Sequence, residues 1–127
     1  AERLVACNAG AHLFPDTSLA WPYGFGALPA FLPAASRPPA DLIRDYIGLP
    51  LTLYQGLADC DPEHPLLDRS ETAMAQGPHR LARGKAALAM ARGLGGRWRY
   101  HEAPGVPHSL GGLLAKPEAE EAIFGAE

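Results

Sequence analysis

Two turns in the sequence carry residues suited to proton chemistry, and each follows a segment with the character of a strand. Asp59 follows the nearly continuous apolar run from Leu49 to Gln55, and His108 follows the alternating run from Arg97 to Glu102. In an open α/β sheet, reactive groups gather outside the carboxyl ends of the strands. If the two strands are neighbours, Asp59 can accept a hydrogen bond from His108, fix its tautomer and stabilise the imidazolium.

An Asp–His pair implies a nucleophile as its third member, and the sequence offers no convincing one. The pattern Gly-x-Ser-x-Gly, which marks a serine on a strand-to-helix turn, does not occur. None of the serines follows a strand and opens a helix, and Ser109 adjoins the candidate base itself. The four serines are Ser18, Ser36, Ser70 and Ser109.

The remaining candidates for chemistry are weaker. Asp61 is an alternative acid, although two further residues separate it from the strand. The other histidines are interpreted as surface or loop residues, and neither His-x₃-His nor Cys-x₂-Cys occurs, so we expect no metal site. These histidines are His12, His64, His79 and His101.

A long excursion rich in Pro and Gly, residues 12–40, separates the first predicted strand from the first predicted helix. Loops of this length are uncommon and often functional. Its aromatic residues Trp21, Tyr23 and Phe25 are candidates to line a substrate pocket under a lid. Packing of the loop for stability explains them equally well, and both interpretations stay open here.

The composition is that of an ordinary globular protein of one modest domain. The 127 residues are 47% hydrophobic and 20% charged, with a formal net charge of −3. This charge disfavours nucleic-acid and anionic-membrane partners, and the scattered arginines, Arg80 and Arg83 among them, are interpreted as solvated. No apolar run reaches the ~18 residues of a membrane span.

Cys7 and Cys60 are expected to be small buried thiols, with a bridge between them geometrically possible.

Strands alternate with helices along the chain, which favours an α/β fold of three layers with a mostly parallel sheet and right-handed crossovers. Asp41 is predicted to cap the first helix, which Gly48 ends, and Pro78 to open the second. The predicted elements are a strand at Arg3 to Cys7, a helix from Asp41, a strand at Leu49 to Gln55, a helix from Pro78 to Gly93, a strand at Arg97 to Glu102, and helices at Leu110 to Ala115 and Pro117 to Phe124.

The two turns resemble those of a known superfamily. Gly56-Leu-Ala-Asp59 is similar to the acid turn of the α/β-hydrolases, and Pro104-Gly-Val-Pro-His108 to their catalytic-histidine turn. The order, acid and then histidine, also matches. Leu4 to Gly10 resembles the strand that follows the nucleophile helix, and Asp68 to Arg83 resembles the esterase and poly(hydroxyalkanoate)-depolymerase-like branch. Pro107 and Ser109 depart from the commoner residues without removing the base.

The resemblance implies that residues 1–127 are the C-terminal part of a single α/β-hydrolase domain with about three strands, in which residues 12–40 are a lid-like or pocket-lining loop. It implies an esterase-type serine hydrolase in which Asp59 and His108 serve a serine upstream, and which needs no cofactor. The chain starts without Met in a predicted strand, which fits this expectation. The partners are then a small-molecule ester and an N-terminal half, in cis or as a second chain. The alternative is a non-catalytic interaction module that pairs with such a chain.

Overall fold

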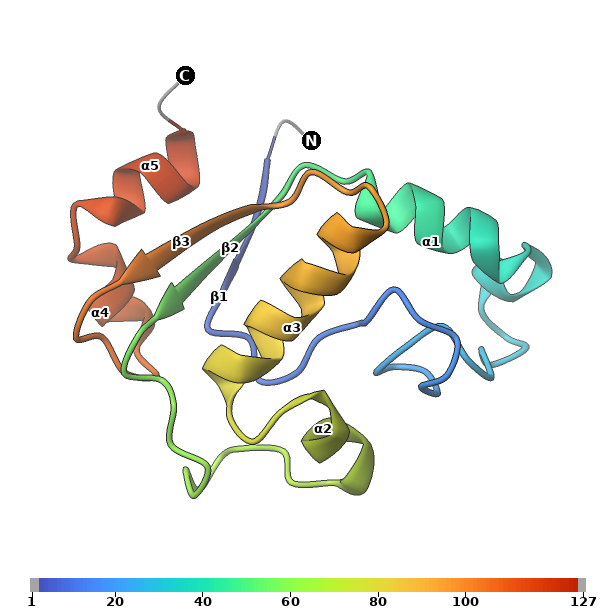
Figure 1. Ribbon diagram of the computed structural model, residues 1–127, viewed down its shortest axis with the longest axis horizontal. Helices are drawn as coiled ribbons and strands as arrows, with labels where there is room; N and C mark the ends of the chain where they lie inside the picture. Colours follow the sequence, from blue (N-terminus) through green and yellow to red (C-terminus); the bar gives the residue numbers. More distant parts are fainter. Residues whose placement is uncertain (1–2, 126–127) are drawn as a thin grey trace.

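Three parallel strands form one sheet in residues 3–125, the part of the chain that this computed structural model describes (Figure 1). Leu53, on the central strand, lies opposite Ala6 on one side and Tyr100 on the other. Because all strands run the same way, their carboxyl ends lie at one edge of the sheet. The predicted α/β class is confirmed. The strands, in their spatial order, are β1 (Leu4–Cys7), β2 (Leu51–Gly56) and β3 (Arg99–Ala103).

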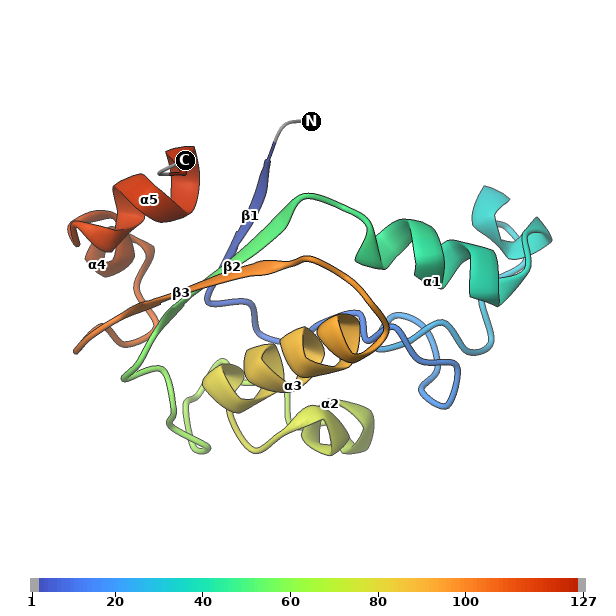
Figure 2. The ribbon, with the colours of Figure 1, turned by 45° about the horizontal axis from the view of Figure 1, so that its top comes forward.

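The central strand β2 separates two apolar clusters, because successive side chains of a strand point to opposite faces of the sheet. Leu53 belongs to one cluster and the adjacent Tyr54 to the other, and both side chains are buried. Helix α3 (Arg80–Gly93) covers the first face, and α5 (Glu118–Phe124) covers the second (Figure 2). This is the three-layer arrangement that the alternation of elements predicts.

The larger cluster joins the sheet to α3 and α1 (Pro39–Ile47). At its centre is Trp98, which packs edge-on against Tyr46 with ring centroids 5.0 Å apart, a favourable geometry for two aromatic rings. Ala87 and Ala91 stand one turn apart on α3, and their small side chains let the helix approach the sheet closely. The other buried members are Phe14, Ile47, Leu53 and Leu88.

The smaller cluster lies under α5 and α4 (Leu110–Leu114). Tyr54 is fully buried there, and its hydroxyl donates to the backbone oxygen of Leu113 at 2.8 Å. The hydrogen bond satisfies the phenol and ties α4 to the sheet. The turn between β3 and α4, which carries His108, is therefore anchored at both of its ends.

Helix α1 begins two residues before its predicted cap. Pro38 is the N-cap and Pro39 the first helical residue, a place where the missing N–H of proline costs no intrahelical bond. The prediction that Asp41 caps this helix is therefore wrong. Asp41 lies in the first turn instead, where its carboxylate interacts favourably with the helix dipole. The helix ends at Ile47, with Gly48 following it as predicted.

Other boundaries also differ from the prediction. His79 caps α3 by accepting a hydrogen bond from the N–H of Ala82 at 3.1 Å, so Pro78 precedes the cap and does not open the helix. β2 and β3 each begin two residues later than predicted. A short helix, α2 (Glu71–Gln76), is not predicted at all, and Ser70 caps it by accepting from the N–H of Ala73.

Residues 12–38 form the irregular excursion, with a single 3₁₀ turn at Pro33–Ser36. Gln76 of α2 anchors its start. The buried amide of Gln76 accepts from the backbone N–H of His12 at 3.0 Å and donates to the carbonyl of Tyr23 at 3.1 Å. The excursion is therefore tied to the helix that follows the Asp59 loop.

The two cysteines are free thiols. Cys60 is exposed, which contradicts the expectation of a buried thiol. Cys7 is half-buried, and this burial raises the pKa of its thiol.

Within residues 3–125, no helix combines the length and the apolar character needed to cross a membrane.

Candidate active site

The side chains of Asp59 and His108 meet at the carboxyl edge of the sheet. Asp59 is 4% exposed, whereas 32% of the His108 side chain is exposed. Nδ1 of the imidazole lies 3.0 Å from Oδ2 of the carboxylate. When Nδ1 carries the proton, it donates to the carboxylate and leaves Nε2 free to accept a proton. The structure thus brings together the two residues that the sequence singles out.

Backbone hydrogen bonds fasten the turn of the acid to the turn of the histidine. The N–H of Leu57 donates to the oxygen of Ala103 at 3.0 Å, and that of Ala58 donates to the oxygen of Val106 at 3.0 Å. Asp59 closes its own turn by donating to the carbonyl three residues earlier, at 3.1 Å. The backbone therefore sets the position of the carboxylate relative to the imidazole.

Asn8, at the end of β1, bridges the same two turns with its side chain. Oδ1 accepts from the N–H of Gly56 at 2.9 Å, and Nδ2 donates to the oxygen of Pro107 at 3.1 Å. Asn8 has a φ of 46°, a conformation that asparagine tolerates better than most residues. This bridge is not predicted from the sequence. Its partners are distant in sequence, so no local pattern reveals them.

The ring of His64 packs edge-on against His108. The ring centroids are 5.3 Å apart, and the planes meet at 74°. Nδ1 of His64 accepts from the N–H of Leu66 at 3.1 Å, which places the proton of the neutral ring on Nε2. His64 lies in a loop, as predicted, but its contact with the imidazole of His108 is a further feature of the site.

Two arginines of α3 are buried, so the prediction that they are solvated is wrong. Arg80 is 3% exposed and Arg83 is fully buried. Arg83 donates to the backbone oxygens of Gly10 and Asp68, each at 2.8 Å. These bonds satisfy the buried guanidinium and join the turn after β1 to the loop that follows Asp59. Nη1 of Arg80 lies 3.5 Å from Oδ1 of Asp59.

The three aromatic residues of the excursion do not act as one group. Trp21 and Phe25 line a hollow of about 360 Å³ together with Leu42 and Tyr46 of α1. Tyr23 does not line this hollow. Its hydroxyl donates to a carboxylate oxygen of Asp68, which lowers the pKa of that carboxyl group. That this hollow holds a substrate stays a prediction.

Serine side chains have structural roles in the described residues. Ser109 caps α4 by accepting from the N–H of Gly112 at 2.9 Å, and Ser70 caps α2. Ser18 and Ser36 hydrogen-bond within their own turns. Residues 3–125 therefore hold a paired acid and base, with no serine hydroxyl hydrogen-bonded to the base.

The alternative acid, Asp61, lies on the surface. Its carboxylate accepts from the N–H of Glu63 at 2.8 Å, and the carboxylate that hydrogen-bonds His108 is that of Asp59. Across the described part of the chain, no group of three or more His, Cys, Asp and Glu side chains is arranged to hold a metal ion.

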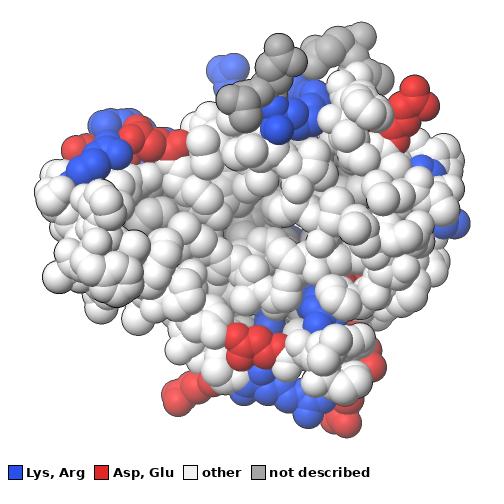
Figure 3. All heavy atoms as spheres, turned by 180° about the vertical axis from the view of Figure 1, so that it is seen from behind, with Lys and Arg blue, Asp and Glu red and all other residues white. Residues whose placement is uncertain are grey.

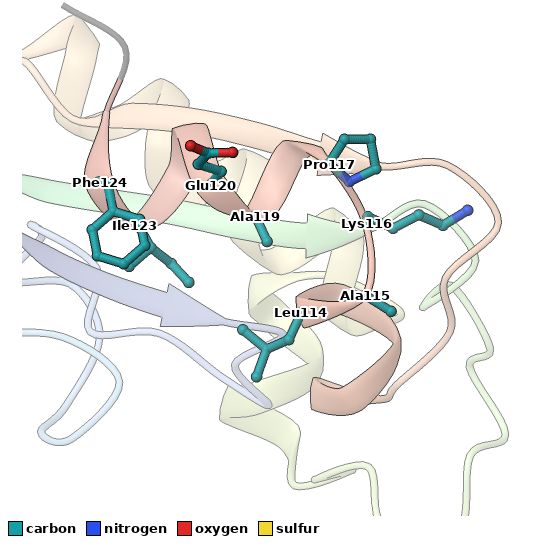
Figure 4. Close-up of a pocket in the computed structure, with 8 residues that line it drawn as sticks. All are labelled: Leu114, Ala115, Lys116, Pro117, Ala119, Glu120, Ile123 and Phe124. Carbon is teal, nitrogen blue, oxygen red and sulfur yellow. The ribbon is translucent and has the colours of Figure 1, made fainter.

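A second hollow lies over α4 and α5, away from the Asp59–His108 pair. It has a volume of about 620 Å³ and is lined by side chains of both helices, Leu114, Ile123 and Phe124 among them (Figure 4). Figure 3 shows the side of the molecule opposite to that of Figure 1. The centre of this face carries few charged side chains, and most of the charged side chains lie toward its margins. The exposed apolar side chains include Leu4, Leu114 and Phe124.

Comparison with solved structures places this arrangement among known folds. Poly(aspartic acid) hydrolase-1 from Sphingomonas sp. KT-1 is similar with a TM-score of 0.72 and 36% sequence identity, over 87% of this chain and 41% of that one. LpqC, a poly(3-hydroxybutyrate) depolymerase from Bordetella parapertussis, is similar with a TM-score of 0.74 and 23% identity, over 98% and 42% of the two chains. This chain has the α/β-hydrolase fold.

The relation to α/β-hydrolases that the two turns predict is thereby confirmed, and so is the fold class. This α/β-hydrolase-fold chain spans less than half the length of either similar structure. No protein-family model matches it, and no curated protein matches it.

Proposed function

We propose that this chain is the C-terminal part of an esterase-type serine hydrolase and supplies the acid and the base of a Ser-His-Asp triad. One observation carries the proposal, namely the 3.0 Å contact between Nδ1 of His108 and the buried carboxylate of Asp59. The two similar structures, a hydrolase and a depolymerase, support hydrolysis as the class of reaction. The ester specificity and the triad are our proposal.

In this mechanism, Nε2 of His108 removes the proton from the serine hydroxyl as its oxygen attacks the ester carbonyl carbon. The imidazolium then gives the proton to the leaving alkoxide, and the carbon–oxygen ester bond breaks. In the second half, Nε2 takes a proton from water as the water oxygen attacks the acyl carbon. The bond between that carbon and the serine oxygen then breaks, the imidazolium returns the proton to the serine oxygen, and the acid is released. Asp59 keeps the proton of the ring on Nδ1 throughout and stabilises the transient cation.

We place the nucleophile and the oxyanion donors on a complementary N-terminal half, in cis or as a second chain. β1 is an edge strand that pairs with β2 on one side only within the described residues. A parallel strand along its other side would end at the same edge of the sheet as Asp59 and His108. That strand would carry a serine on a strand-to-helix elbow, the geometry that a nucleophile of this fold requires.

Labelling with a fluorophosphonate tests the proposal, because the reagent modifies only an activated serine. A polypeptide that contains both halves should be labelled. The His108→Ala variant should not react, whereas His101→Ala, which alters a histidine of β3 outside the site, should react as the wild type does. Absence of labelling in the polypeptide with both halves would refute the serine-hydrolase proposal.

A non-catalytic module that pairs with a complementary chain is the second candidate, and the unpaired edge of β1 favours it. Exposed apolar residues, with Leu114 51% and Phe124 77% exposed, also suit a protein partner. The same labelling experiment separates the two candidates. A module binds the partner chain stably without any labelling, whereas a hydrolase is labelled when both halves are present.

A further inference from the structure

The carboxylate of Asp59 has two partners, one at each oxygen. Oδ2 faces Nδ1 of His108 at 3.0 Å, and Oδ1 faces Nη1 of Arg80 at 3.5 Å. Within residues 3–125 this carboxylate has no other hydrogen-bond or ion-pair partner. If Oδ1 were free, the carboxylate could rotate about its bond to Cβ and present either oxygen, or neither, to the imidazole.

The pair formed by Arg80 and Asp59 is shielded from water, because their side chains are 3% and 4% exposed. Charges attract each other more strongly in such surroundings than at the surface. Nη1 and Nε of Arg80 have no hydrogen-bond partner in the described part of the chain. The carboxylate of Asp59 is therefore the group that compensates the charge of this guanidinium.

The backbone fixes Arg80 beside the acid turn. The residue after it, Leu81, donates its N–H to the backbone oxygen of Asp59 at 3.1 Å. The backbone oxygen of Arg80 accepts from Nε2 of the buried Gln55 at 3.2 Å. The first turn of α3 is thus hydrogen-bonded both to β2 and to the turn that follows β2. The guanidinium of Arg80 therefore approaches Oδ1 from a fixed direction.

We infer that Arg80 is a positioning residue, which holds Oδ1 of Asp59 so that Oδ2 stays directed at Nδ1 of His108. It thereby maintains the tautomer of His108 with the proton on Nδ1 and Nε2 open. This role rests on the proposed function, since an open Nε2 is what a general base needs. The ion pair and the tautomer themselves can be measured in the chain without any substrate.

Arg83 provides a matched control on the same helix. It is as deeply buried as Arg80, but its guanidinium donates to the backbone oxygens of Gly10, Asp68 and Gly77 and forms no hydrogen bond or ion pair with Asp59. Replacing Arg83 therefore loosens the same helix without removing the partner of Oδ1. A merely structural role for Arg80 would make the two replacements equivalent.

The test is the tautomer of His108, read from the ¹⁵N shifts of its ring nitrogens in the 127-residue chain. The measurement is made at alkaline pH, and the ¹⁵N shifts themselves show when the ring is neutral. We expect the Nδ1–H form to dominate in the wild type and in Arg83→Gln. In Arg80→Gln it should fall to the minor form, because the carboxylate is no longer held.

The inference is wrong if Arg80→Gln keeps the tautomer ratio of the wild type, or if Arg83→Gln lowers it equally. If Arg80→Gln does not fold, Arg80→Lys takes its place. A lysine keeps the charge but lacks the planar fork of arginine, so a partial fall is expected, and an unchanged ratio overturns the inference. Hydrogen exchange adds a check in the wild type. Guanidinium protons of Arg80 that exchange as fast as those of the exposed Arg69 would refute the shielded pair.

Because no readout depends on turnover, failure of this inference differs from failure of the proposed function. If the tautomer of His108 depends on Arg80 but no fluorophosphonate adduct forms, only the serine-hydrolase proposal is refuted. If the polypeptide is labelled but the tautomer of His108 does not depend on Arg80, only the positioning role of Arg80 is refuted.

Discussion

A Cβ atom on Gly56 would lie 2.1 Å from the backbone oxygen of Val106. The acid turn and the histidine turn therefore touch, backbone against backbone, at a point where no side chain fits. Glycine is needed here for this close approach. The contact is part of what keeps the carboxylate of Asp59 within hydrogen-bond distance of His108.

Replacing Gly56 by Ala should destabilise the fold and separate the two turns. Forcing one methyl group into a closely packed site costs about 1–3 kcal/mol, which urea unfolding will measure. Gly93 is the control, since a Cβ there has no atom within 4 Å and Ala favours a helix. Gly93→Ala should leave the free energy of unfolding unchanged or raise it, and an equal loss in both variants would contradict this account.

Removing the bridge made by Asn8 should also lower stability. Asn8→Ala leaves the N–H of Gly56 and the oxygen of Pro107 without their side-chain partner, at a cost of about 1–3 kcal/mol for each group that stays buried. The positive φ of Asn8 adds strain in the alanine variant. Asn8→Gly relieves the strain but not the lost bonds, so it should fall between Asn8→Ala and the wild type. A glycine variant as stable as the wild type would show that the bridge contributes nothing.

Acidification should destabilise the fold through His12. Burial, and secondarily the charge of Arg83, lower the pKa of His12 from 6.5 to about 4. Between these two values the unfolded chain binds more protons at this site than the folded one. The stability that the neutral His12 contributes is therefore fully present above about pH 6.5 and is lost as the pH falls toward 4. The loss in the free energy of unfolding is up to roughly 3 kcal/mol.

Urea unfolding at several pH values between 4 and 7 measures this loss. His12→Gln, which does not titrate, should flatten the dependence over that interval, whatever its effect on stability at neutral pH. A variant that loses stability between pH 6.5 and 4 as steeply as the wild type would assign the effect to other groups. His79→Gln serves as a control that removes a histidine at the cap of α3.

The meeting of Asp59 and His108 is predictable from sequence because it needs little more than local patterns. Each residue lies in a turn directly after a strand, and parallel strands place such turns at one edge of the sheet. The sequence predicts the pair on the condition that β2 and β3 are neighbours, and the structure shows that they are. For this reason the pair is recovered while individual boundaries, such as the cap of α1, are misplaced.

The supporting residues are missed because their partners are far away in sequence. Nothing in the spacing of Arg80 and Arg83 distinguishes a buried arginine from a solvated one, since burial depends on backbone oxygens supplied by separate loops. The bridge made by Asn8 likewise joins residues that are distant in sequence. For α2, the sequence does carry a usable signal, a capping serine, Ser70, followed directly by an acidic residue.

The most direct test of the central claim is the hydrolysis of a p-nitrophenyl ester by a polypeptide that joins residues 1–127 to the complementary N-terminal half. We expect turnover that requires both halves and falls by several orders of magnitude in His108→Ala and in Asp59→Asn, as loss of triad members does. His101→Ala should retain the wild-type rate. Turnover that persists undiminished in His108→Ala would contradict the assignment of this pair as the acid and base.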